Sequence, residues 1–247
     1  YLQETDGVTL TSVVASDGAI TVTAAGTLAA VDVVSTTDND ANDITLTSSS
    51  ALTVTTVNAG STAGDVIITA TDLILNTSIT GHDVTITESA GANIDVAAAS
   101  TGAGMTLDKA ELAKITANNV NVVSSGTIKI DSLEAANTVN ISDILKLDAG
   151  TDVIVTDGAN AFATTNGLTL EADDGVDLTL ATNNSLTVGT NLLVTADADG
   201  DGSDAKDKIT IGAGATITAT AGNITFANAA NGADLSGSGD TVTIQTS

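Results

Sequence analysis

Short bursts of alternating apolar and polar residues recur along the whole chain. Ile20-Thr21-Val22, Ile44-Thr45-Leu46 and Leu168-Thr169-Leu170 are three examples of more than twenty. A period of two is typical of a β-strand with one buried face. Gly, Asn, Asp and Ser turns such as Asp17-Gly18 and Asp157-Gly158 separate the bursts and tolerate positive φ. We therefore expect an all-β chain.

The bursts recur at a loose period near 20 residues, with two strands in each period, which indicates a repeat architecture. The apparent equivalents are Ile44 with Val66, Val66 with Val84, Val84 with Met105, Leu168 with Leu186, and Leu186 with Ile209. We predict a parallel β-helix (β-solenoid) of roughly twelve turns spaced about 4.8 Å apart. Stacked immunoglobulin-like sandwiches are the alternative, although they need longer strands and a bulkier core.

The composition favours the thin tube. Apolar residues make up 42% of the 247 positions, but the aromatic residues are only Tyr1, Phe162 and Phe226. A core of small aliphatic side chains suits a narrow interior, in which we expect Phe162 and Phe226 to be plugs. The chain has no Pro, as expected where each strand needs its N–H donors for neighbours on both sides. Because no segment reads as a linker, residues 1–247 are predicted to form one continuous solenoid segment.

One segment, residues 107–115, departs from the strand pattern. Its residues are good helix formers, and its apolar positions Leu107, Leu112 and Ile115 are not spaced as in a strand. We predict a short helix or helical turn packed beside the tube, with another solenoid turn as the alternative.

Two stretches carry a resemblance to a known family. These are residues 107–122, with Glu111-Leu112 and Ile115-Thr116-Ala117 followed by an alternating strand, and residues 1–22, which open on Tyr1-Leu2-Gln3-Glu4. They resemble phrases of very long bacterial secreted proteins of the filamentous-haemagglutinin and "β-strand repeat" type. The resemblance implies a right-handed β-helix, export to the cell surface and a role in adhesion or matrix. It implies no catalytic or binding residue.

The charge balance excludes several classes of function. Six Lys, no Arg and 31 acidic residues give a formal net charge of −25, which argues against a nucleic-acid-binding surface. No run of apolar residues reaches the length of a membrane span. The absence of Cys excludes disulfides and thiolate metal sites. Outward Asp side chains along a rod would repel one another, so divalent cations are the natural means of screening them.

The best candidate for calcium is the acidic run from residue 197 to residue 208. Its opening matches the Asp-x-Asp-x-Asp-Gly start of calcium loops, in which carboxylates at alternate positions converge on one ion. Lys208 stands where a bidentate Glu is expected, so a solvated acidic loop is the alternative. The candidate ligands are Asp197, Asp199, Asp201, Asp204 and Asp207. Residues 38–43 are a weaker version of this motif, and residues 237–242 are interpreted as a turn.

The sequence lacks the catalytic residue patterns of solenoid enzymes. Polysaccharide lyases of this architecture need a basic residue beside a carboxylate that a cation neutralises, but the Lys residues lie in scattered turns. Hydrolases need grouped acids, and Asp173-Asp174 is interpreted as an isolated pair. The single His82 is interpreted as a turn residue rather than a general base. We therefore expect no enzyme activity.

Thr-x-Thr pairs suggest a flat outer face. Pairs such as Thr21 with Thr23 and Thr45 with Thr47 would project outward and stack into ladders between turns. Ice binding is one interpretation of such ladders, while lateral contact between fibres is the one we favour. Thr is also the ordinary outward residue of a half-solvated strand.

Taken together, these patterns predict an extracellular β-solenoid that forms a stalk or fibre at the bacterial cell surface and acts in structure or adhesion. The alternative is a calcium-dependent binding or fibre-assembly module. We expect the chain to be a piece or repeat module of a larger protein. Its expected partners are further copies or flanking modules, and a host surface, a neighbouring cell or a polysaccharide.

Overall fold

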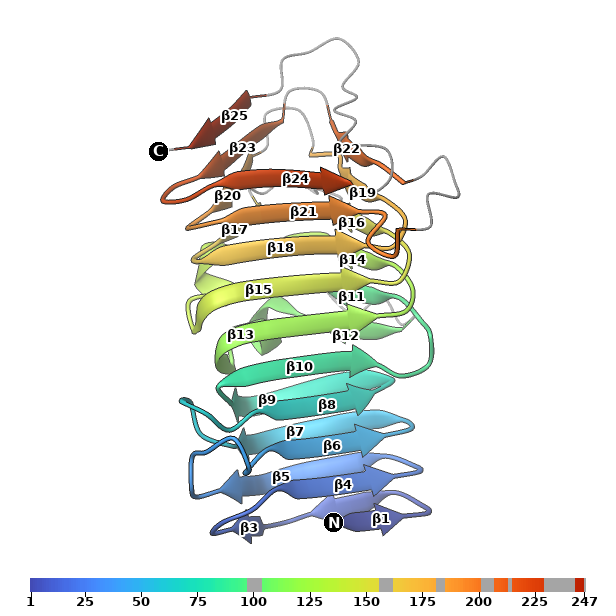
Figure 1. Ribbon diagram of the computed structural model, residues 1–247. Coiled ribbons are helices and arrows are strands. Elements are labelled where there is room, and N and C mark those ends of the chain that lie inside the picture. The colour runs from blue at the N-terminus through green and yellow to red at the C-terminus, as the bar shows by residue number, and fades with distance from the viewer. Residues whose placement is uncertain are drawn as a thin grey trace.

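The computed structural model describes residues 1–96, 104–155, 162–180, 185–200, 207–212, 215–228 and 243–246. In this part of the chain there are 25 strands, one short α-helix and one 3-10 helix. The strands lie in layers that follow one another from the N-terminal strands to the C-terminal ones (Figure 1). All strand pairings between described residues are parallel, as in the pairs β4–β6 and β15–β18. The prediction of an almost all-β chain with parallel strands is confirmed, and the alternative of antiparallel sandwiches is wrong.

The largest sheet has 15 strands, and its main path runs the height of the stack. Each strand on this path pairs with the strand of the next layer. The ten strands are β1 (Leu2–Glu4), β4 (Ile20–Ala24), β6 (Ile44–Ser48), β8 (Val66–Ala70), β10 (Asp83–Glu88), β13 (Ile115–Ser124), β15 (Ile141–Ala149), β18 (Gly167–Ala172), β21 (Leu192–Ala196) and β24 (Ile224–Asn228). At about 4.8 Å per step, ten layers span about 43 Å.

A second run of the same sheet covers the other side of the N-terminal half (Figure 1). It contains β2 (Val8–Leu10), β3 (Val13–Ala15), β5 (Leu28–Ser35), β7 (Ala51–Asn58) and β9 (Asp72–Thr80). The two runs meet in the ten-residue strand β13. Its first two residues pair with Ile79 and Thr80 of β9, while Asn119 to Val123 pair with β10. A register shift between Ala117 and Asn119 separates these two parts of β13.

Two smaller sheets complete the stack toward the C-terminus. One consists of β12 (Met105–Leu107), β11 (Ile94–Val96), β14 (Ile128–Ile130), β16 (Val153–Val155), β19 (Val176–Leu178) and β22 (Ile209–Ile211). The other consists of β17 (Phe162–Thr164), β20 (Ser185–Val188), β23 (Thr216–Ala219) and β25 (Thr243–Thr246). The N-terminal half is thus built mainly from two runs of strands, and the C-terminal half from three.

The predicted helical turn is present as α1 (Lys109–Leu112), at the level where this change occurs. Asp108 caps it by accepting a hydrogen bond from Glu111 N, and Glu111 Oε2 accepts one from Asp108 N. Glu111 Oε1 accepts a further hydrogen bond from Leu75 N, and Lys114 Nζ donates to Leu75 O. The helix segment therefore supplies partners to the β9 backbone at Leu75, whereas the described pairing of β9 with β13 is limited to Ile79 and Thr80.

The 3-10 helix η1 (Ala135–Asn137) continues the same column. Helix α1 contacts both β9 and η1, and η1 in turn contacts β17. Asn137 Nδ2 donates to Lys109 O across this contact. Two helical turns thus fill the space between the last strand of one run and the first strand of another.

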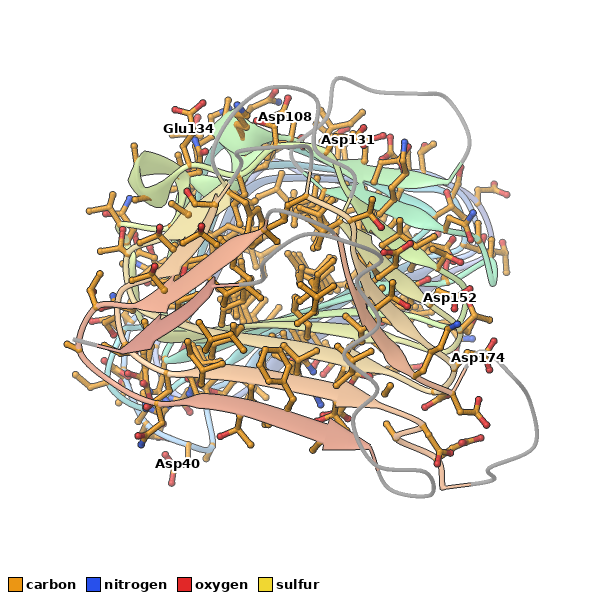
Figure 2. The ribbon with its side chains drawn as sticks, turned by 90° about the horizontal axis from the view of Figure 1, so that it is seen from above. Asp40, Asp108, Asp131, Glu134, Asp152 and Asp174 are labelled. Atoms are coloured by element: carbon orange, nitrogen blue, oxygen red, sulfur yellow. The ribbon has the colours of Figure 1, made fainter. Side chains whose placement is uncertain are left out.

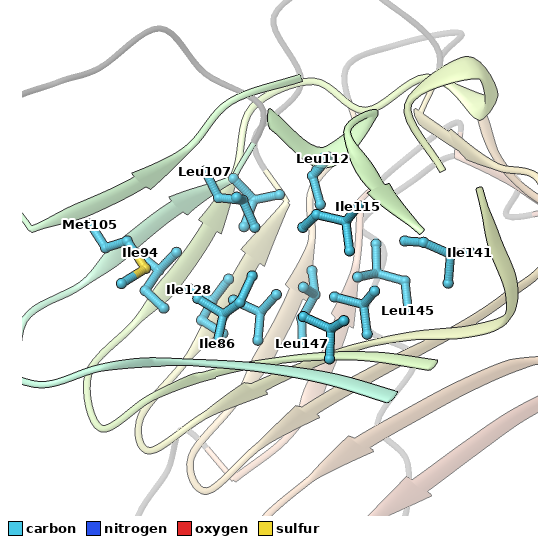
Figure 3. Packing of buried hydrophobic residues seen from close by; sticks show 14 of the residues in the cluster. Ile86, Ile94, Met105, Leu107, Leu112, Ile115, Ile128, Ile141, Leu145 and Leu147 are labelled. Carbon is cyan, nitrogen blue, oxygen red and sulfur yellow. The ribbon is translucent and has the colours of Figure 1, made fainter. Parts of the chain in front are cut away.

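The interior is one cluster of aliphatic side chains that extends from Leu10 to Ile217. The inward positions of the strands are buried and the outward ones are half exposed, as in the alternating pattern of β4. Figure 2 looks down the stack onto this filled interior, and Figure 3 shows the part around Ile86, Leu112 and Leu145. Phe162 is 3% exposed, whereas Phe226 is half buried against the cluster. The expected aliphatic core with a buried Phe162 is confirmed.

The period was predicted correctly only in the N-terminal half. Ile44 pairs with Val66 and Val66 with Val84, as expected. However, Val84 pairs with Val120 rather than Met105, because β11, β12 and α1 lie between them in the sequence. Leu168 pairs with Leu192 rather than Leu186, and Leu186 pairs with Ile217 rather than Ile209. Those two expectations were wrong because consecutive strands in this region, β18, β19 and β20 and then β21, β22 and β23, belong to three different sheets.

Within the described residues, no helix has both the length and the apolar character needed to cross a membrane.

Candidate functional surface

The outer surface is acidic, and Asp and Glu side chains project from it around the stack. Figure 2 labels six of them, among them Asp40, Asp152 and Asp174, at the periphery of the view. The lysines lie beside some of these acids. Lys146 Nζ is 3.0 Å from oxygens of both Asp148 and Glu171. Lys109 pairs with Glu134 and Lys129 with Asp131. Because six lysines stand against 31 acidic residues, the surface stays strongly negative.

Carboxylates at one corner connect successive layers, in an arrangement that we call the corner ladder (Asp43, Asp65, Asp83 and Asn119). Asp43 Oδ1 accepts a hydrogen bond from Asp65 N, and Asp65 Oδ1 accepts one from Asp83 N. Asp83 Oδ1 accepts two, from Asn119 N and Asn119 Nδ2. Each of the three carboxylates therefore binds a backbone N–H group of the next layer, and the Asn119 side chain adds a second hydrogen bond to Asp83.

Asp38, the first residue of the weaker calcium candidate at residues 38–43, binds the turn of the next layer. Asp38 accepts hydrogen bonds from the backbone N–H groups of residues 61 to 64 and from the Thr62 hydroxyl. Such a run of converging N–H groups is an anion-binding nest. Gly60, at φ +99°, is required beside it, because a Cβ there would lie 2.2 Å from Asp38 Cγ. The Asp38 carboxylate therefore holds the turn of the next layer in place.

These hydrogen bonds, led by the one from the Thr62 hydroxyl and that from Gly64 N, hold the pKa of Asp38 well below its usual value of 3.8. A lowered pKa means that the carboxylate stabilises the fold fully above pH 3.8, and that this contribution is lost as the pH falls toward the folded-state pKa. We expect Asp38→Asn to lower the urea midpoint at pH 7. The difference in urea midpoint between the wild type and the variant should be smaller at pH 3 than at pH 7. Asp40→Asn is the control, because the Asp40 side chain is exposed and lies only two residues away in the sequence. Its urea midpoint should equal that of the wild type at both pH values.

The five predicted calcium ligands are only partly placed. Asp201 and Asp204 lie outside the described residues. Asp197 is fully buried with φ 51°, Asp199 is exposed and Asp207 is 4% exposed. Calcium binding stays a prediction.

The turn at residues 173–175 brings other acids to the same corner. Asp197 N donates to Asp174 O, and Val176 N donates to Lys208 O, so both ends of the predicted loop flank this turn. Burial, followed by the charges of Asp199 and Asp148, raises the pKa of Asp173. The interpretation of Asp173-Asp174 as an isolated pair was therefore wrong. The spacing of the strands could have shown this. Leu168 pairs with Leu192, which is 24 residues later, and a step of 24 residues also leads from Asp173 to Asp197.

Outward threonines form a column on the N-terminal half of the main sheet. Thr23, Thr47, Thr69 and Thr87 pair in register from β4 to β10. The neighbouring column is interrupted by Ile67, which lies between Thr45 and Thr85. The predicted threonine ladder is thus present in β4 to β10, but only one of its two columns is continuous.

His82 lies in the turn between β9 and β10, with a side chain that is 38% exposed. Its place in a turn agrees with the sequence interpretation. Sequence reasoning missed its neighbours, because Asp65 belongs to the preceding layer. The Nδ1 atom is 3.6 Å from Asp65 Oδ1 and 3.8 Å from Asp83 Oδ1, so His82 lies against the corner ladder.

Comparison with known proteins gives no relative. No family model, no curated protein and no solved structure matches the chain.

Proposed function

We propose that the chain is a non-catalytic, right-handed β-solenoid segment that forms a rigid stalk or fibre at the outer surface of a bacterial cell. The observation that carries the proposal is a column of residues paired in register through eight consecutive layers. Its members are Thr23, Thr47, Thr69, Thr87, Val123, Asp148, Glu171 and Thr195. The column crosses both the two-run half and the three-sheet half without a break.

The mechanism that we propose is mechanical. In a parallel stack the hydrogen bonds between strands run along the long axis, and each layer depends on its two neighbours. Bending such a stack would stretch these bonds on one side and compress the aliphatic interior on the other. The acidic exterior keeps the stack soluble and discourages contact between copies unless cations screen it.

The proposed location and partners rest on the sequence phrases at residues 1–22 and 107–122 that resemble giant bacterial surface proteins. Further copies or flanking modules of the same protein would continue the stack. The threonine column offers a flat face for lateral contact with another fibre. A host surface, a neighbouring cell or a polysaccharide is the proposed target of adhesion.

One hollow in the described part of the surface does not carry the pair of groups expected of a catalytic site. A hollow of about 390 Å³ lies along the corner where β4 and β6 end. Ser, Thr and Ala side chains line most of it, and Glu4 is its one titratable side chain. One carboxylate among hydroxyls lacks the second acid or base that hydrolysis or proton abstraction requires.

A calcium-dependent module is the second candidate function. It is favoured by the gathering of Asp173, Asp174, Asp197 and Asp199 at one corner of neighbouring layers. Oxygen ligands of this kind suit calcium. In this interpretation the ion would fix that corner and thereby the contact between adjacent fibres.

Because the chain has no Cys, a pair of introduced cysteines can test the rigid-stalk proposal directly. Thr23→Cys with Thr195→Cys places spin labels seven layer steps apart, about 34 Å between backbones at about 4.8 Å per step. We expect a narrow distance distribution by pulsed electron paramagnetic resonance. Thr23→Cys with Val123→Cys, four steps or about 19 Å apart, is the matched control. A broad distribution for the long pair would contradict rigidity, and a change caused by millimolar calcium would favour the second candidate.

The Thr195→Cys substitution also tests the proposed location at the outer surface of the cell. In intact cells that make the protein, a membrane-impermeant maleimide should label Thr195→Cys as fully as it does after permeabilisation. Labelling that requires permeabilisation would contradict a surface role.

A further inference from the structure

The single imidazole of the chain lies within reach of two carboxylates from adjacent layers. One oxygen each of Asp65 and Asp83 and one ring nitrogen of His82 all lie within 4.8 Å of one another. His82 Nδ1 is 3.6 Å from Asp65 Oδ1 and 3.8 Å from Asp83 Oδ1. These two nitrogen–oxygen distances fit ligands that share one metal ion at about 2.1 Å, which can lie at most about 4.2 Å apart.

The two carboxylates are held by backbone N–H groups and by Asn119 Nδ2 rather than by the imidazole. Asp65 Oδ1 is fixed by Asp83 N at 3.0 Å, and Asp83 Oδ1 by Asn119 N at 3.1 Å. The backbone of His82 is held from both sides, because its N–H donates to Gly64 O and its carbonyl accepts from Asn118 N. Each oxygen that faces the imidazole therefore has a fixed place, which lowers the entropic cost of gathering the ligands around an ion.

Gly81 allows the close turn that brings the imidazole to this place. A Cβ at position 81 would lie 2.9 Å from Asp83 O and 3.1 Å from Val66 Cγ2. Any larger residue would push residues 81–83 away from the neighbouring layer. The sequence Gly81-His82-Asp83 thus sets the imidazole against the corner ladder.

The electrostatics of this corner favour a cation. Among the described residues, the ion-pair contacts of Asp65 and Asp83 are those with His82, and no lysine lies within 4 Å of either carboxylate. Both carboxylates are about 40% exposed on a chain of formal net charge −25. An ion can therefore reach them, and the surrounding field attracts it.

We propose that Asp65, His82 and Asp83 bind one divalent transition-metal ion of the zinc class on the side wall of the stack. One imidazole nitrogen with two carboxylate oxygens is a donor set for zinc, cobalt, nickel or copper rather than for calcium or magnesium, which prefer oxygen alone. The three ligands come from one side, so water completes the coordination from the solvent. The ion joins the layer of β8 to the layer of β10 through side chains.

The competing account is a protonated His82 that pairs with the two carboxylates and binds no metal. It uses the same distances, so the two accounts differ only in their response to the ion. Because His82 is the only histidine, its ring gives a single pair of proton–carbon signals in a nuclear magnetic resonance spectrum. This makes the ring a direct reporter of binding.

The test is a titration of the untagged chain with zinc chloride at pH 7, in the presence of millimolar magnesium and calcium. We expect one saturable site by calorimetry, with the His82 ring signals shifting to saturation at one equivalent. Ring signals that do not move, or zinc uptake without a defined stoichiometry, would overturn the proposal and leave the ion pair as the account of this cluster.

Matched variants assign the ligands. His82→Gln removes the imidazole at similar size, and Asp65→Asn keeps an oxygen for Asp83 N–H while removing the charge. Each should weaken zinc binding at least about tenfold. Asp40→Asn removes one exposed charge elsewhere and should bind zinc as the wild type does. Equal urea midpoints for the four proteins show that the fold is kept. Wild-type affinity in His82→Gln would disprove the site even if zinc binds the chain.

Discussion

The substitution Thr169→Pro is expected to disrupt the stack severely, because it falls in the middle of an inner strand. Thr169 lies within β18 and is paired with Lys146 of β15 on one side and with Leu193 of β21 on the other. Proline removes an N–H group from the interstrand ladder and places its ring against a neighbouring strand. We expect the free energy of unfolding to fall by about 3 kcal/mol or more, measured by urea denaturation.

Thr169→Val is the control for this experiment. It keeps the N–H group and the β-branched shape at an outward, half-exposed position, so the change should stay below about 1 kcal/mol. If proline were tolerated as well as valine, β18 could not be an inner strand of the sheet, and the layer order in the C-terminal half would have to be rejected.

Leu46→Ala is expected to have the second-largest effect. Leu46 is 0% exposed in the centre of β6, and its register neighbours Val22 and Ile68 are also in the core. Removal of the side chain leaves a cavity that a tightly layered interior cannot fill by collapse, because the strands above and below are fixed by hydrogen bonds. We expect a loss of about 3 kcal/mol in the free energy of unfolding, within the usual range of about 2 to 5 kcal/mol.

The adjacent position provides the control. Thr45 is on the same strand but points outward and is half exposed. Thr45→Ala should therefore cost less than about 1 kcal/mol in the same urea experiment. Similar losses for the two variants would mean that β6 does not have one buried and one solvated face.

The strands and their orientation could be predicted from the sequence because they depend on local patterns. Alternation of aliphatic residues with Thr marks the strands, and the lack of aromatics and Pro indicates a narrow stack with neighbours on both sides of each strand. The helical turn within residues 107–115 was also predictable, because its residues are good helix formers and its apolar positions are not spaced as in a strand. The capping box of Asp108 and Glu111 is a finding of the structure.

The change from two runs of strands to three sheets could not be predicted in this way. It depends on β13, whose two ends pair with different strands, and on the use of α1 and η1 in place of strands. Neither is visible in periodicity, because short apolar bursts look alike whichever sheet they join. The equivalences after Val84 were therefore misassigned.

In the candidate sites, too, the local pattern could be predicted from the sequence but the contacts between layers could not. Acidic runs are easily seen in a sequence, but the partners of each carboxylate depend on which residues of the next layer lie opposite. Asp38 reaches the turn at residues 61–64, and Asp65 reaches His82, across 17 or more residues. Once the pairing register between strands is known, each of these contacts can be found by looking for the residues that lie opposite in the next layer.

The corner turns also determine how such a protein can change in evolution. Paired residues lie 18 positions apart between Val66 and Val84 but 36 apart between Val84 and Val120, although the sheet continues through both steps. Insertions at the corners therefore leave the hydrogen-bonded register intact. A duplicated or deleted stretch of DNA that encodes one whole layer would lengthen or shorten the stack while its new neighbours still match. Recombination between repeats could thus adjust the reach of the protein in steps of about 4.8 Å.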